Sequence, residues 1–459
     1  MTAKRGGLAN SPIVMRHLNQ KAVVQFALGH ESFTTSDLIA ETGLTRATVI
    51  AICTDLIAAG WLADVTNVAP LDHPHRGDST TPERSRRRGR PGRQYALSPA
   101  AGSVIGIDAG QHTITGAIAT LRGTTLARRE VPIDAAELTD AERVEAVRTL
   151  AQQLLDDAQL AHTAQHPPEG LSVPVGRPLL TVIGVPAPVD KQGHSPRGDN
   201  DFWDKMNPHY RDELERVRVY NDANLAAVAE RFRSGGTNLA TVLSGERLGA
   251  GLIVDGELLR GKWGGAGEMR FLTDFFGDAE AFDGAARLAR RWTSQALAGR
   301  LDGFSGLCAA DVEGSVLAAG GGTVPGGAGA SAMGGAGDVV PGEDGTGSKV
   351  TAEQVFAAAG EEDRLACAVL ERIGIRLARI TSALSSLLGV ETVIVAGALA
   401  SAMEPVIEVA RRTLTQITTG PYPELRASDL GRDVVVHGAI EAALAGVRAD
   451  PLGFQFEKK

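Results

Sequence analysis

The sequence predicts an α/β protein in which a small helical unit precedes a larger body of strands and helices. Two observations carry this prediction. Up to about residue 60, apolar side chains recur at helical spacing, with breaks at Gly29 and Gly43. From Val104 onward the pattern changes to short apolar runs that are typical of buried strands, beginning with VIGIDAG. The 459 residues are enough for about three domain-sized units.

The composition is that of a folded, water-soluble protein, with 43% apolar and 22% charged residues. No apolar run reaches the roughly 18 residues that a membrane span needs. The N-terminus, MTAKRGGLANSP, lacks the apolar core of a secretory signal. The three cysteines, Cys53, Cys308 and Cys367, are scattered, which suits a reducing compartment. We therefore expect a cytoplasmic protein.

Charge is distributed unevenly along the chain. Residues 1–100 hold 12 Lys/Arg against 8 Asp/Glu, a net of +4, whereas the whole chain carries −9, which leaves −13 for the rest. Six arginines fall between Arg84 and Arg93. A basic unit attracts nucleic acid, and an acidic body repels it. The charge pattern therefore indicates a nucleic-acid-binding unit at the N-terminus.

The third predicted helix of this unit has the pattern of a recognition helix. Thr45 is a suitable N-cap and Gly60 a suitable stop. A stripe of apolar residues at i, i+3, i+4 and i+7 should face the core. The stripe consists of Val49, Ile52, Cys53 and Leu56. In a helix-turn-helix the first residues of this helix meet base edges in the major groove, which here predicts DNA contacts by Thr45, Arg46 and Thr48.

Two short strands, at 61–65 and 94–97, are predicted to close a winged module around a long polar loop. The loop ends in Arg88-Gly89-Arg90-Pro91, an extended basic segment that suits a narrow A·T-rich minor groove. The expected DNA contacts of this wing are Arg86, Arg87, Arg88, Arg90 and Arg93.

Several motifs of the body resemble those of the ROK family of sugar kinases and sugar-sensing repressors. They are VIGIDAG (104–110), GVPAPVD (184–190), NDAN (221–224), SGERLGAG (244–251) and RGKWGGAGEMRF (260–271). A GRP segment before a Tyr-x-Leu strand also resembles the wing of ROK repressors. The resemblance implies a two-lobed actin-like ATPase fold behind a winged helix-turn-helix. Its limits are expected at 1–98 for the DNA-binding domain, 99–235 for lobe 1 and 236–459 for lobe 2.

The resemblance also implies a sugar site. Asp222 matches the aspartate that acts as general base toward the sugar hydroxyl in the kinases. The same carboxylate can hold a hydroxyl without chemistry, and the Asn-Asp pair would cap the following helix in either case. The residues expected to contact a sugar are Asn200, Asn221, Asp222 and Glu268.

Both phosphate loops of the family pattern are altered. In the first, Asp108 and Gly110 remain, but Gln111, His112 and Thr113 replace Gly, Thr and Lys. The second keeps Gly245, Gly249 and Gly251 but gains Glu246 and Arg247, and a carboxylate repels phosphate unless it is paired. Gly397 remains in the adenosine-side motif. We therefore expect no ATP turnover, no cofactor and no working catalytic residue.

A metal is not expected either, because structural zinc needs about four Cys/His ligands. Phe271 stands where the family has a histidine, and the following cysteine cluster is absent. Residues 320–348 contain 12 glycines among 29 and are expected to form a disordered insert.

The resemblance implies a sugar-responsive DNA-binding regulator, a repressor of carbohydrate-uptake or catabolism genes. Operator DNA, a sugar or sugar phosphate, and a second copy in a homodimer or homotetramer would be its partners. One alternative is an ATP-dependent sugar kinase with an accessory DNA-binding unit. Another is a constitutive DNA-binding protein whose body serves only as a dimerisation scaffold.

Overall fold

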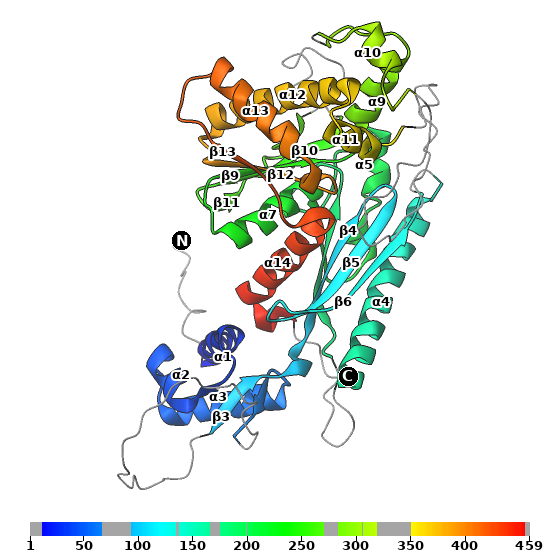
Figure 1. Ribbon diagram of the computed structural model, residues 1–459. Helices are drawn as coiled ribbons and strands as arrows, with labels where there is room; N and C mark the ends of the chain where they lie inside the picture. Colours follow the sequence, from blue (N-terminus) through cyan, green and yellow to red (C-terminus); the bar gives the residue numbers. More distant parts are fainter. Residues whose placement is uncertain are drawn as a thin grey trace, which may run out of the picture.

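The computed structural model describes residues 12–66, 93–134, 137–165, 175–198, 200–269, 283–304, 306–318 and 350–454. Within these ranges the named strands form three sheets. The sheets follow one another along an elongated molecule, with the N-terminal unit at one end (Figure 1). None of the described helices combines the length and the apolar character that a bilayer span requires.

The N-terminal unit contains three helices and a three-stranded antiparallel sheet of order β1-β3-β2. Gly43 ends the second helix in the left-handed conformation, at φ 67°, and Thr45 caps the third by accepting the N–H of Thr48. Both predicted boundaries are confirmed. The elements are α1 (Pro12–Gly29), β1 (Phe33–Thr34), α2 (Thr35–Thr42), α3 (Arg46–Ala58), β2 (Leu62–Asp64) and β3 (Gln94–Leu97).

The first lobe of the body is built on a five-stranded sheet of order β6-β5-β4-β7-β8. The strands β6, β5 and β4 are antiparallel, and β4, β7 and β8 are parallel. The strands are β4 (Ser103–Ala109), β5 (Thr113–Thr120), β6 (Thr125–Pro132), β7 (Pro178–Val185) and β8 (Val217–Asn221). The helices that pack on this lobe or extend its loops are α4 (Asp140–Gln165), α5 (Asp201–Met206), α6 (Tyr210–Glu213) and α14 (Val434–Ala449).

The second lobe repeats this topology, with a sheet of order β11-β10-β9-β12-β13. The repeat confirms the predicted two-lobed α/β body. Its strands are β9 (Leu239–Ser244), β10 (Leu248–Val254), β11 (Glu257–Leu258), β12 (Thr392–Ala396) and β13 (Glu424–Ala427). Its helices are α7 (Asp222–Ser234), which packs on β9 and β10, α9 (Ala285–Leu297), α10 (Ala309–Glu313), α11 (Ala352–Gly360), α12 (Arg364–Leu388) and α13 (Glu404–Ile417).

Three consecutive valines, Val434–Val436, form the first turn of α14. A run of valines favours a strand where one face is exposed, but all three side chains here are buried. The helix packs on the first sheet and on α7. At the α7 contact a Cβ on Gly438 would lie 1.8 Å from the carbonyl oxygen of Leu225, so only glycine allows this approach.

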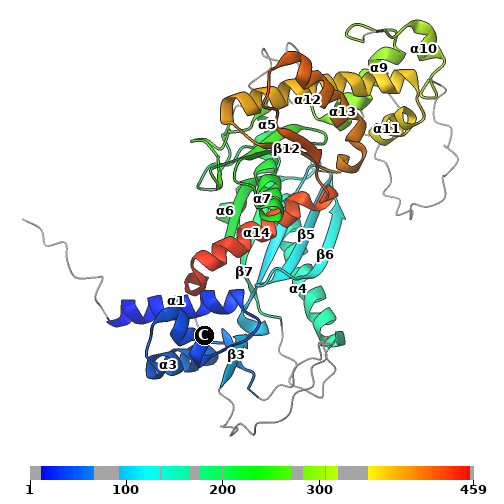
Figure 2. The same cartoon turned by 60° about the vertical axis from the view of Figure 1, so that its left-hand side comes forward.

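The N-terminal unit and the body share one apolar core. Val24 and Leu28 of α1 belong to the same buried cluster as Leu121 of the β5–β6 hairpin and Val447 of α14. Figure 2 shows α14 running from the body down to α1. The N-terminal unit is therefore packed on the end of α14.

Candidate functional site between the lobes

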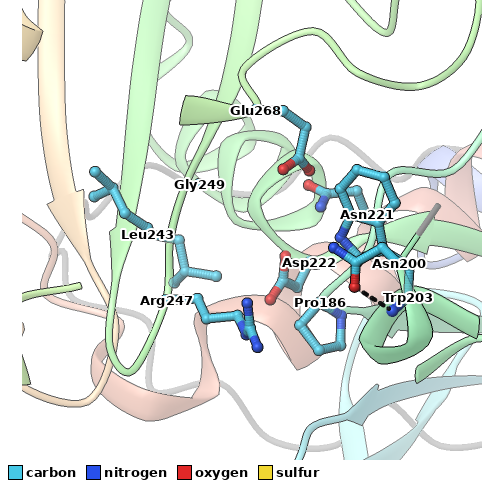
Figure 3. Close-up of a pocket in the computed structure, with 10 residues that line it drawn as sticks. Pro186, Asn200, Trp203, Asn221, Asp222, Leu243, Arg247, Gly249 and Glu268 are labelled. Atoms are coloured by element: carbon cyan, nitrogen blue, oxygen red, sulfur yellow. Dashed lines mark hydrogen bonds between the residues drawn. The ribbon is translucent and has the colours of Figure 1, made fainter. Parts of the chain in front are cut away.

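A cavity of about 160 Å³ lies between the two lobes (Figure 3). The first lobe contributes the end of β7, the start of α5 and the junction of β8 with α7, and the second contributes the β9–β10 turn and the loop after β11. The structure brings all four residues predicted to contact a sugar to this cavity. Its lining consists of Pro186, Asn200, Trp203, Asn221, Asp222, Leu243, Arg247, Leu248, Gly249 and Glu268.

Asp222 is the first residue of α7, directly after β8. One carboxylate oxygen, Oδ1, accepts the N–H of Ala223 at 2.7 Å. Burial raises the pKa of Asp222 to about 7, although hydrogen bonds from backbone N–H groups and the charge of Arg247 oppose the rise. Near neutral pH this carboxyl group can therefore act as a donor or an acceptor toward a hydroxyl.

Both the oxygen and the nitrogen of the Asn221 side-chain amide form hydrogen bonds within the protein. Its Oδ1 accepts the N–H of Asn224 at 3.0 Å, which caps α7, and its Nδ2 donates to the carbonyl of Ala187 at 3.2 Å. The capping role predicted for the Asn-Asp pair is confirmed for Asn221. Asn221 thus fixes the direction of Asp222 and ties α7 to the loop after β7.

Asn200 and Glu268 reach the cavity from opposite lobes. The Oδ1 of Asn200 caps α5 by accepting the N–H groups of Phe202 and Trp203, at 3.0 and 3.3 Å (Figure 3). The loop that carries Glu268 lies against β10, where a Cβ on Gly267 would be 1.8 Å from the carbonyl oxygen of Ala250. Glycine at 267, with φ 86°, is what lets this loop approach closely enough to bring Glu268 to the cavity.

Sequence reasoning missed Arg247 as a residue of the sugar cavity, because it appeared only as an alteration of a phosphate loop. Its guanidinium carbon lies 3.5 Å from the centre of the Phe202 ring. No local pattern in the sequence indicates this contact, because it depends on how the two lobes meet.

The first altered phosphate loop is held from inside by a buried arginine. Arg143, on α4, is 1% exposed and donates to the carbonyls of Ala109 and Gly110, at 2.6 and 2.8 Å. Beside this turn, burial together with the charge of Asp222 raises the pKa of Asp108 to about 8. The turn keeps Asp108 and Gly110 but has no lysine to meet a phosphate.

In the second loop Glu246 is paired, which is the condition under which a carboxylate was not expected to repel phosphate. Both carboxylate oxygens accept from Arg290, at 2.7 and 2.6 Å. Burial alone would raise the pKa of Glu246, but the hydrogen bonds and charge of Arg290 lower it overall, and His112 of the first loop adds to this. Both backbone groups of Gly245 are also hydrogen-bonded within the protein: its N–H donates to the carbonyl of Arg247, and its carbonyl accepts the N–H of Ala286.

The retained glycines of the loops serve packing. A Cβ on Gly251 would lie 2.1 Å from the carbonyl oxygen of Ala223, and one on Gly249 would lie 3.3 Å from the Cβ of Ala223. Gly397 adopts φ 118°, which side chains rarely tolerate. These glycines are needed for the α7–β10 contact and the turn after β12, so their presence does not by itself indicate nucleotide binding.

The predicted DNA contacts are only partly within the described residues. Thr45 and Arg46 are exposed at the start of α3, Thr48 is half-buried, and Arg93 is exposed before β3. The hydroxyl groups of Thr45 and Thr48 lie 2.9 Å apart. Arg86, Arg87, Arg88 and Arg90 lie outside the described residues, as do Phe271 and the insert 320–348.

Among the residues that the structure places, no three His, Cys, Asp or Glu side chains form a metal-ligand cluster. The segment after Arg270 that carries the zinc ligands in the family pattern falls in an undescribed range. The absence of zinc therefore stays a prediction.

Comparison with known proteins places these features in a family. Residues 104–273 match the ROK family model. A solved ROK family transcriptional regulator, a homologue of the E. coli MLC protein, is 17% identical, with a TM-score of 0.58 over 94% of this chain and 96% of that chain. This likeness shows a shared fold. No curated protein matches the sequence.

Two solved ROK kinases also align with part of this chain. The glucokinase from Streptomyces griseus, solved with glucose and AMPPNP, is 22% identical over 75% of this chain and all of its own, at 0.49. The hexokinase from Thermus thermophilus is 20% identical over 76% and 99%, at 0.48. The family match and the regulator's fold agree with the motifs and the two-lobed body, and the chain is a protein with a ROK family domain.

Proposed function

We propose that this chain is a sugar-responsive, DNA-binding transcriptional regulator whose body binds a monosaccharide or its phosphate without phosphorylating it. The observation that carries the proposal is the contrast between the two halves of the site. The sugar side offers a cavity with Asp222, Asn200 and Glu268, whereas in the second phosphate loop Glu246 occupies the guanidinium group of Arg290 and the first loop has no lysine.

The chemistry of the cavity supports a sugar ring. Carboxylates, amides and a guanidinium supply acceptors and donors for hydroxyl groups, and Trp203 offers an apolar surface.

The state of the phosphate loops supports binding without turnover. Phosphoryl transfer depends on positioned cations and backbone N–H groups around the phosphates. Here the N–H of Gly245 is used within its own turn, and the first loop lacks the lysine of the family pattern. The rival function, an ATP-dependent sugar kinase, requires these groups to rearrange.

The N-terminal unit supports DNA binding by a winged helix-turn-helix. The start of α3 is exposed with Arg46 at its first position, and the regulator with the same fold aligns over 94% of this chain. We propose that a homodimer or homotetramer presents paired α3 helices to operator DNA. A sugar switches binding only if it favours one arrangement of the N-terminal units over another.

Three measurements on the full chain separate the proposals. Thermal shifts against aldohexoses, aldopentoses, N-acetylhexosamines and hexose 6-phosphates should find a ligand, since a ligand of the folded state raises the melting temperature. Mobility shifts with DNA selected from a random library should show binding that this sugar alters and that Arg46→Ala weakens. A coupled assay should find no sugar-dependent ATP turnover.

Each rival predicts a different outcome of these measurements. Turnover that Asp222→Asn abolishes would establish the kinase. DNA binding that no sugar on the panel alters, with no thermal shift, would instead support the scaffold alternative. A chain that selects no DNA would refute the proposed function.

A further inference from the structure

One contact crosses from lobe to lobe at the sugar cavity. Arg247 belongs to the β9–β10 turn of the second lobe, and its guanidinium carbon lies 3.5 Å from the ring centre of Phe202 on α5 of the first. Arg247 also lines the cavity, where Figure 3 places its guanidinium beside the carboxylate of Asp222. The residue thus touches both the opposite lobe and the space that a ligand would fill.

Both partners of this contact are attached firmly to their own lobes. The neighbouring Glu246 holds Arg290 of α9 with two hydrogen bonds, and its carbonyl accepts the N–H of Gly284 at 3.0 Å. On the other side, the Oδ1 of Asn200 accepts the N–H of Phe202 itself. Because neither backbone is loosely held, a change in the separation of the lobes must change the Arg247–Phe202 contact.

A guanidinium group can serve a ring and a ligand at the same time. Its flat face stacks on an aromatic ring, while its five N–H donors lie in the plane and point outward from its edge. Arg247 is the one cation among the ten lining residues, and it lies near enough to Asp222 to oppose the rise of that residue's pKa. A hydroxyl group between the two residues would find a donor on one side and a carboxyl group on the other.

We propose that Arg247 is the residue through which an occupied cavity holds the lobes together. Stacked on Phe202, it donates to a hydroxyl or phosphate oxygen of the monosaccharide that Asp222 also contacts, so binding of the sugar stabilises the closed arrangement of the lobes. This regulatory role rests on the proposed sugar binding. It assigns a positive function to a residue that departs from the family pattern of the second phosphate loop.

The test uses two variants of the full chain and one matched control. Phe202→Leu removes the stacking ring but no residue that lines the cavity. Arg247→Lys keeps the charge but loses the planar face and the fork of donors. Phe232→Leu, at a phenylalanine that is 62% exposed on α7, is the control for the Phe-to-Leu change.

Calorimetry with the monosaccharide of largest thermal shift should show a roughly 2- to 30-fold weaker affinity in Phe202→Leu, the range that a cation–π contact supports. Arg247→Lys should lose at least as much, and Phe232→Leu should match the wild type. Small-angle scattering should show that this sugar reduces the radius of gyration of the wild type but not of Phe202→Leu. Unchanged affinity and full compaction in Phe202→Leu would overturn the proposal.

A ligand-free measurement separates this inference from the proposed function. If no sugar binds the wild type, the proposed sugar sensing fails. The Arg247–Phe202 contact can still be judged, because the unliganded Phe202→Leu and Arg247→Lys proteins should both scatter with a larger radius of gyration than wild type. Equal radii in all three proteins would then refute the link between the lobes, and circular dichroism would verify that each variant is folded.

Discussion

Arg122 donates to the carbonyl oxygen of His30 at 2.6 Å and thereby ties the β5–β6 hairpin of the body to the end of α1. The same Nη2 also lies within 3.4 Å of the carbonyls of Ala27 and Glu31. A cation at this position satisfies the unpaired carbonyls of the helix end and complements its dipole. The N-terminal unit is thus held by a specific polar contact as well as by the shared apolar core.

We expect Arg122→Ala to loosen the N-terminal unit from the body. Hydrogen bonds to a charged group contribute about 1.5–3 kcal/mol, and the variant leaves three carbonyls with one partner fewer. Hydrogen exchange should become faster in the last turn of α1 while the second lobe stays protected. Arg129→Ala, which breaks the exposed pair with Asp157, is the control and should leave the exchange of α1 as in wild type. Equal exchange of α1 in both variants would contradict the role of Arg122.

Glu246 and Arg290 should be energetically coupled, but their coupling energy should be small, because both side chains are more than one-third exposed. A bidentate pair of this kind contributes about 1 kcal/mol. In a double-mutant cycle, Glu246→Ala and Arg290→Ala should each destabilise the chain, and the double variant should lose less than their sum. Additive losses in chemical denaturation would show that the two residues act independently. None of the three variants should gain ATP turnover, since the lysine of the first loop is still missing.

The pH dependence of stability should carry the signature of two partly buried carboxyl groups. The pKa values of Asp222 and Asp108 are raised from 3.8 to about 7 and about 8. Between about pH 4 and pH 8 the folded state therefore holds more protons than the unfolded state, so this contribution to stability falls as pH rises and is lost above about pH 8.

Asp222→Asn should remove part of this fall, because an amide does not ionise. The melting temperature of the variant minus that of wild type should be more positive at pH 8 than at pH 5, by several °C. This magnitude follows because about 1 kcal/mol corresponds to roughly 2–4 °C in domains of 150–250 residues. Asp212→Asn, at an exposed carboxylate, is the control. Parallel melting curves of Asp222→Asn and wild type across this range would contradict the raised pKa of Asp222.

The sequence predicted the cavity better than it predicted the contacts that shape it. Asn200, Asp222 and Glu268 lie in short motifs whose local residues determine their positions, so their convergence could be anticipated. The pairing of Glu246 with Arg290 joins residues 44 positions apart, and no local pattern indicates it. The contact of Arg247 with Phe202 likewise depends on how the two lobes meet. The burial of all three valine side chains at Val434–Val436 is also a tertiary property, and it favours a helix where the valines alone would favour a strand.

The close packing of α14 on α7 makes Gly438 the most sensitive test of the connection between the sugar cavity and the N-terminal unit. Because α7 begins at Asp222 and α14 ends at the contact with α1, this helix pair lies between the two proposed binding sites. Gly438→Ala would place a methyl group 1.8 Å from the backbone oxygen of Leu225, so the helices must separate. Overpacking of this kind costs about 1–3 kcal/mol.

We therefore expect Gly438→Ala to lower the midpoint of chemical denaturation and to weaken the effect of sugar on DNA binding. Gly360→Ala, at the end of α11, adds the same methyl group where no atom lies within 4 Å, and it should be neutral or slightly stabilising. The comparison separates a general effect of alanine from one of helix spacing. If both variants release DNA at the same sugar concentration as wild type, the α7–α14 contact does not transmit the signal, and coupling must follow the β5–β6 hairpin to Arg122 instead.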